Sequence, residues 1–203
     1  VVMTSLVFGL MINSAKNSYT AIDASVHAFG TNLVLIDRSL RSYGIHARDA
    51  RASLAAYVEE AIAAPARVDD STSAKPDTAG AALDRFGNAL MSLDPADDYH
   101  ADLLADIRQQ YRRLYEQRWS IVEQSEGAIP MPLIAMLVTW LMLIFGSFGY
   151  RAPRNVVVVG SFLLSSALIA GAFYLVLNMD VPFSGPIQIS DAPLRRALAE
   201  MRM

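Results

Sequence analysis

Two long runs without a charged residue, both in the last 80 residues, restrict what this chain can fold into. No Asp, Glu, Lys or Arg occurs over the 24 positions from Gly127 to Tyr150, or over the 25 positions from Asn155 to Met179. An α-helix needs about 20 mostly apolar residues to cross the hydrocarbon layer of a bilayer. A surface helix of a soluble protein keeps one polar face instead. The two runs therefore predict two transmembrane helices within residues 129–179.

The first 15 residues are also uncharged, but they are too few to cross a bilayer on their own at about 1.5 Å per residue. They lack the basic leader and the small-residue cleavage site of a signal peptide. We expect residues 1–15 to belong to a longer transmembrane helix whose upstream part precedes this sequence.

The apolar residues of the first 43 positions recur every three or four residues, which is typical of a helix packed along its length against other helices. Gly44 is the expected terminator, so we predict one helix of about 60 Å. It packs either on copies of itself or on the helices expected over 47–64 and 103–122. The residues at this spacing are Phe8, Ile12, Ala15, Tyr19, Ile22, Val26, Phe29, Leu33, Ile36 and Leu40.

Residues 16–126 hold 12 basic and 17 acidic residues, a net charge of −5, so we expect a solvent-exposed helical body over residues 44–128. Its short helix is predicted over 82–93, and the next helix begins with Asp94 as N-cap and Pro95 at the first helical position. Small and polar residues over 65–80 indicate a flexible loop. Residues 180–203 are expected to form a loop and a short amphipathic helix.

No alternating strand pattern is present, so the predicted fold class is all-α. The chain is expected to be an integral membrane helical protein whose long helices extend from the membrane into the solvent-exposed body.

Composition and motifs argue against several kinds of chemistry. The net charge of −3 disfavours nucleic acid as a partner, and the absence of cysteine excludes disulfides and thiolate metal sites. Asp98, Asp102 and Asp106 share a helix face and could attract a divalent cation, but such a row is more often a solvated flank. We see no phosphate-binding loop or nucleophile motif. We therefore expect no metal, no cofactor and no enzymatic activity.

A polar stripe runs beside the apolar residues of the first helix: Gly9, Asn13, Lys16, Thr20, Asp23 and His27 recur at spacings of four and three. It would face a pore or vestibule formed by several copies, or else pack closely near the membrane and become a solvated face. Two small pairs in the second predicted span, Ser161 with Ser165 and Ala167 with Gly171, have the spacing of helix-packing residues.

Several segments resemble a family of bacterial bestrophin-like membrane proteins. They are Arg118-Trp-Ser-Ile-Val-Glu-Gln, Ile129-Pro-Met-Pro, the run from Phe145 to Asn155 and the run from Met179 to Arg195, which includes Pro182, Phe183 and Gly185. In the first helix, Gly30, Thr31 and Asp37 match the family motif. The resemblance implies an integral protein of the bacterial inner membrane, usually with one more N-terminal span than is present here.

The family name comes from a distant likeness to bestrophins, which are pentameric anion or cation channels. The likeness implies a homo-oligomer in contact with membrane lipids, and an ion channel. A non-conducting scaffold or accessory subunit, whose helical body docks other proteins, is the alternative. The bestrophin calcium site is not carried over, because Pro186-Ile-Gln-Ile stands where bestrophins have an acidic run.

Two indicators of membrane orientation disagree. Arg151 and Arg154 lie in the short connection between the predicted spans, and the positive-inside rule places that connection in the cytoplasm. The bestrophin likeness instead places the helical body in the cytoplasm.

Overall fold

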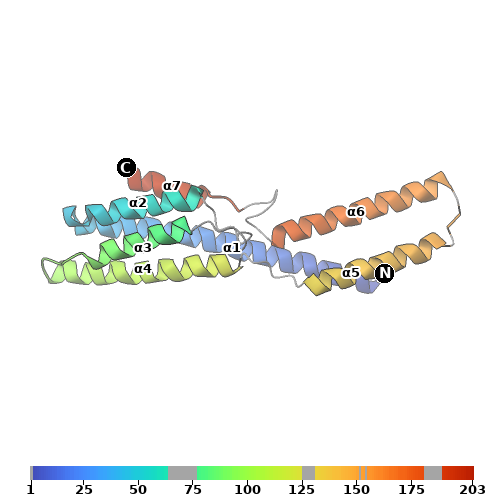
Figure 1. Ribbon diagram of the computed structural model, residues 1–203, viewed down its shortest axis with the longest axis horizontal. Helices are drawn as coiled ribbons and strands as arrows, with labels where there is room; N and C mark the ends of the chain where they lie inside the picture. Colours follow the sequence, from blue (N-terminus) through green and yellow to red (C-terminus); the bar gives the residue numbers. More distant parts are fainter. Residues whose placement is uncertain (1, 64–76, 125–130, 151, 154, 181–188) are drawn as a thin grey trace. The chain divides into compact units, whose positions relative to one another are not determined.

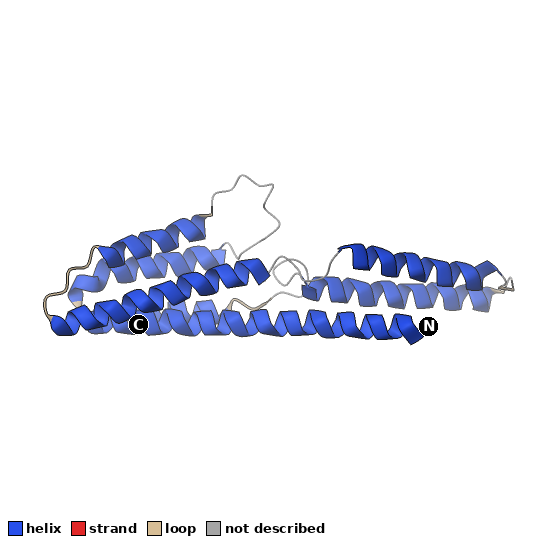
Figure 2. Ribbon diagram, turned by 90° about the horizontal axis from the view of Figure 1, so that it is seen from below, coloured by secondary structure: helices blue, strands red, loops and turns tan. Residues whose placement is uncertain are grey.

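The protein is all-α throughout the residues that the computed structural model describes, which are 2–63, 77–124, 131–150, 152–153, 155–180 and 189–203. These residues form seven α-helices and one short 3-10 helix, η1 (Figure 1, Figure 2). Their bounds are α1 Val2–Tyr43, η1 Ile45–Ala47, α2 Arg48–Ala63, α3 Thr78–Met91, α4 Asp98–Gln124, α5 Met131–Tyr150, α6 Val156–Asp180 and α7 Ala192–Arg202.

The chain divides into two compact units that share α1. The first unit consists of Val1–Thr20 and Gly127–Gln188. The second unit consists of Ala21–Glu126 and Ile189–Met203.

The second unit is a helical bundle built on the second half of α1 (Figure 1). The predicted apolar positions of α1 from Ile22 to Leu40 are all buried in it. The ring of Phe29 meets the ring of Tyr57 on α2 edge-on, with the centroids 6.4 Å apart, and Tyr43 meets His100 of α4 at 5.2 Å. This apolar row is therefore covered by the chain's own helices, not left free for another copy.

In the first unit, the start of α1 contacts α5 and α6. Met11, Ala15, Leu137 and Val176 form its buried cluster, and Phe8 packs against Phe173 with the ring centroids 5.2 Å apart. Ile12, which the sequence placed in the apolar row, is 42% exposed, so that assignment is wrong. Met11 takes its place, because an α-helix repeats every 3.6 residues and drifts away from a strict heptad.

Two helices are long and apolar enough to cross a membrane: Pro132–Tyr150 with 19 residues and Val156–Met179 with 24. Almost none of either helix is buried, whereas the core helix of a soluble protein would be covered. The two spans predicted from the sequence are thus present as candidate spans. Among the described residues, the start of α1 is not a further candidate of this kind.

Two helix starts differ from the prediction. α3 begins at Thr78, not Ala82, because the Asp77 carboxylate accepts a hydrogen bond from the Gly80 N–H at 2.8 Å and caps the helix there. Most of the expected 65–80 loop lies outside the described residues. Asp94 is not the N-cap of α4: the carboxylate of Asp97 accepts from the His100 N–H at 2.8 Å, and the helix begins at Asp98.

We expect the substitution Asp77→Ala to lower the free energy of unfolding by about 1 kcal/mol, because it removes an N-cap. It also removes the carboxylate that accepts two hydrogen bonds from Arg118, at 2.6 and 2.8 Å. The matched control is Asp84→Ala, at an exposed position of the same helix, which should change stability little. Thermal unfolding in detergent micelles, followed by circular dichroism, measures both variants.

The contribution of Asp77 also depends on pH. Burial raises the pKa of Asp77, but hydrogen bonds from Gly80 and Arg118 outweigh it and hold that pKa below its ordinary value. A carboxyl group with a lowered folded-state pKa stabilises the fold above its unfolded pKa of about 3.9 and loses this effect as the pH falls through the folded pKa. The difference between Asp77→Ala and the unaltered protein should therefore be full at pH 7 and shrink below about pH 4. A difference that does not depend on pH would contradict this assignment.

Candidate functional site

The polar stripe lies on the open face of α1. Gly9, Asn13, Lys16, Thr20 and His27 are exposed, and Asp23 is half-buried. The Thr20 hydroxyl donates to the backbone carbonyls of Lys16 and Asn17, both at 3.0 Å, and His27 Nε2 lies 4.0 Å from Asp23 Oδ2. These contacts all stay within α1.

A second row of exposed residues lies beside the polar stripe, and we call it the small-residue row. Its spacing of three and four residues matches that of the buried apolar row, but it lies on a different face of α1. Sequence reasoning missed it, because alanine contributes little to an apolar pattern. Its members are Ala21, Ala24, Ala28 and Thr31, and the larger Leu35, which is 49% exposed, follows at the same spacing.

The family-motif residue Asp37 forms a buried ion-pair cluster that sequence reasoning did not find. Asp37 is 3% exposed, and its carboxylate pairs with Nε of Arg41 and Nε of Arg51, each at 2.8 Å. Arg41 also donates to the carbonyl of Glu200 at 2.6 Å, and Arg51 to that of Met201 at 3.2 Å. The two arginines therefore join the carbonyls at the end of α7 to the buried carboxylate.

The motif residue Gly30 contributes to the same docking. A Cβ atom at this position would lie 2.9 Å from Cβ of Pro193, the buried proline of the first turn of α7. Only glycine lets α7 approach this closely without a shift of the backbone. Thr31 instead points outward from α1 and donates its hydroxyl to the His27 carbonyl at 3.0 Å. The motif positions Pro182, Phe183 and Gly185 lie outside the described residues.

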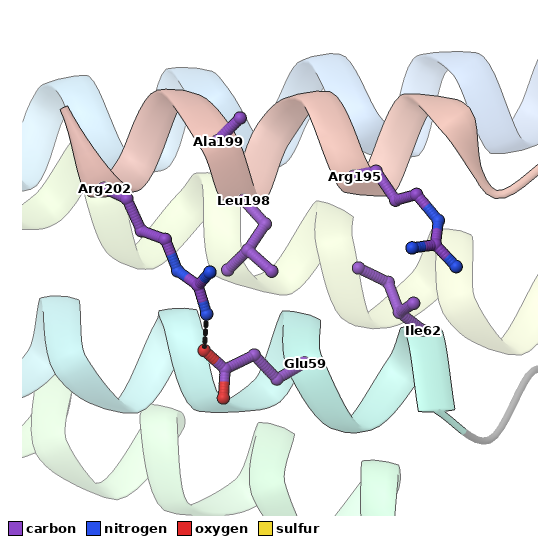
Figure 3. Close-up of a pocket in the computed structure, with 6 residues that line it drawn as sticks. All are labelled: Glu59, Ile62, Arg195, Leu198, Ala199 and Arg202. Carbon is purple, nitrogen blue, oxygen red and sulfur yellow. Dashed lines mark hydrogen bonds and ion pairs between the residues drawn. The ribbon is translucent and has the colours of Figure 1, made fainter.

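α7 also pairs with α2 along a shallow groove of about 350 Å³. Figure 3 shows Arg202 of α7 reaching Glu59 of α2, with an Nη2–Oε1 distance of 2.7 Å. Leu198 and Ile62 supply the apolar part of the groove (Figure 3). Arg195 pairs with Asp191 at 2.7 Å, and this hydrogen bond holds the pKa of Asp191 below its ordinary value. Because both arginines of the groove are already paired, we assign it to docking.

The remaining candidate residues do not form a reactive cluster. In the described part of the chain, no group of three or more His, Asp or Glu residues is placed to hold a metal ion. In the row of acidic residues on α4, Asp106 accepts a hydrogen bond from Gln110 at 2.7 Å. In α6, Ser161 and Ser165 line a groove beside α5, and Ala167 and Gly171 are exposed. Helix packing by these four residues stays a prediction.

We expect Asp37→Asn to release α7. Removing one partner of a fully buried ion pair costs about 3–5 kcal/mol, and because both arginines are partly exposed we expect a loss of stability of about 2 kcal/mol. Hydrogen–deuterium exchange should rise first in α7. The control Asp23→Asn, at a half-buried aspartate of the same helix, should leave α7 protected. Unchanged exchange in α7 would contradict a docking role for Asp37.

Comparison with known proteins supplies the family. The family model of the Bestrophin-like domain matches residues 1–194. Searches of curated proteins and of solved structures gave no match. A match over residues 1–194 shows that the chain belongs to the Bestrophin-like domain family, and with its two candidate spans it is a membrane protein.

Proposed function

We propose that the protein is a homo-oligomeric, multi-pass protein of the bacterial inner membrane whose α1 helices surround a central axis and conduct ions. The polar stripe on the open face of α1 carries this proposal. Polar and charged side chains are costly against lipid and usually face the interior of a bundle or a water-filled cavity. Asn13 and Lys16 are exposed on the part of α1 that packs with the candidate spans. Several copies around an axis would give both side chains a polar surrounding.

The small-residue row supports the assembly of copies. Small residues let helix backbones approach closely, and spacings of three and four residues match those of a second helix. A helix in a ring needs one face toward the axis and a neighbouring face toward the next copy. The polar stripe and the small-residue row are adjacent faces of α1 and meet this requirement.

One observation favours the alternative, a non-conducting scaffold that docks other proteins. On α4, Tyr115 and Trp119 are 38% and 51% exposed, and their ring centroids lie 6.5 Å apart. The guanidinium of Arg118 lies 5.9 Å from the Trp119 ring. Tyrosine, tryptophan and arginine are enriched in protein interfaces. This surface would be the docking site if the protein does not conduct.

Ion flux into vesicles that contain the purified protein tests conduction. We expect a conductance whose selectivity shifts several-fold toward cations in Lys16→Glu, because rings of charged side chains set selectivity in a pore. The control Arg112→Glu makes the same charge change at an exposed position of α4 and should leave selectivity unchanged. No conductance in the unaltered protein would favour the scaffold, and equal shifts in both variants would remove Lys16 from the pore.

Cross-linking tests the assembly separately. The chain has no cysteine, so a single introduced cysteine is the only thiol that the cross-linker can react with. We expect Ala28→Cys, in the small-residue row, to be cross-linked between copies by a short bismaleimide. The matched control Ala105→Cys, at an exposed alanine of α4, should stay monomeric on a denaturing gel. A monomer mass for the detergent-solubilised protein would exclude a shared axis.

A further inference from the structure

In the first unit, α5 and α6 enclose a groove of about 540 Å³ that the proposed function does not use. Leu141, Phe145 and Phe148 line it from α5, and Ser161, Ser165 and Phe173 from α6. Phe8 of α1 lies at one end, where its ring packs on Phe173. Its volume lies within the range of about 300–1,000 Å³ that is typical of ligand sites, and such sites are mostly apolar with a few polar groups.

The groove exists because the packing of this unit is uneven. The buried cluster around Leu137 and Val176 fills the space between the helices at one end. From Leu141 to Phe148 and from Ser161 to Phe173, every side chain is at least partly exposed. Here the small side chains of Ser161 and Ser165 face the same groove as the large ring of Phe145, and serine is too short to fill the space.

We propose that this groove binds one hydrocarbon chain of a membrane lipid. Along α6 it extends from Ser161 to Phe173, which is about 18 Å. The volume divided by this length gives a mean cross-section of about 30 Å². A helix with its side chains has a diameter of about 10–12 Å and a cross-section of about 80–110 Å². The groove is therefore too narrow to enclose a helix of a second copy, whereas a single unbranched chain is much thinner.

The chemistry of the lining agrees with this occupant. None of the residues that line the groove carries a charge. Both flanking helices are the candidate membrane spans, so lipid chains surround the opening of the groove in a bilayer. The proposal holds whether or not the protein conducts ions.

Retention of lipid after purification tests the proposal. The protein is reconstituted in vesicles of palmitoyl-oleoyl phosphatidylcholine, extracted into detergent, washed, and weighed by native mass spectrometry. We expect about one retained phospholipid per chain, and at least a fivefold loss in Ser165→Phe, which fills the groove. The matched control is Ser166→Phe at the neighbouring exposed serine, which does not line the groove. Equal retention in the two variants would overturn the proposal.

A second measurement does not depend on filling the groove. The chain has two tryptophans, Trp119 and Trp140, and both are first replaced by phenylalanine. One tryptophan is then placed in the groove by Phe145→Trp, or on the outside of α5 by Leu143→Trp, where the native leucine is 64% exposed. After reconstitution with chain-brominated phosphatidylcholine and washing in detergent, only the groove tryptophan should remain quenched. Recovery of both signals would overturn the proposal.

A helix of another copy is the competing occupant. In the cysteine-free chain, Ser165→Cys should not be cross-linked between copies by a short bismaleimide. A cross-link at this position would assign the groove to a second copy and overturn lipid binding. It would leave intact the assembly through α1, which Ala28→Cys tests independently.

Discussion

The burial of one face of α1 is the interaction on which both units depend. This 42-residue helix supplies Met11 and Ala15 to the core of the first unit and the residues from Ile22 to Leu40 to the core of the second. Helix stability in proteins comes mostly from tertiary packing of an apolar face. A break in this face would therefore weaken α1 and remove the element that the two units share.

Since one face of α1 is used for folding, any role in assembly falls to the other face. The apolar row is the strongest pattern in the sequence, and it could equally have joined copies of the chain. In the structure the row is buried from Ile22 to Leu40 in the second unit, where Phe29 and Tyr43 at this face meet α2 and α4, and its start packs against α5 and α6 in the first unit. Among the surfaces of α1 that stay open are the polar stripe and the small-residue row, whose polar side chains, alanines and threonine add little to hydropathy. The surface that the proposed assembly would use thus has a weak sequence signal.

Periodicity and charge predicted the helices well, because both are local properties. The absence of charge over Asn155–Met179 predicts α6, and the spacing of Phe29, Leu33 and Ile36 predicts the buried face of α1. Contacts between residues far apart in the sequence could not be predicted from these local patterns. Asp37, Arg51 and Met201 come together only in the folded chain, and their spacing in the sequence does not indicate these contacts. The predicted N-cap of α4 is wrong because Pro95 favours a helix start directly after Asp94, whereas the hydrogen bond from the His100 N–H selects Asp97.

The positions of the motif residues show that Gly30 and Asp37 have a structural role, whereas Thr31 lies on the surface. Gly30 and Asp37 both hold α7, one through close contact with Pro193 and the other through two arginines. Neither residue lines a cavity or faces solvent, so their match to the family motif is explained by the docking of a helix. Thr31, between them, is exposed in the small-residue row and makes only a hydrogen bond within α1. Of these three residues, Thr31 alone is placed where a function in assembly would act, so its substitution can test that function without disturbing the docking of α7.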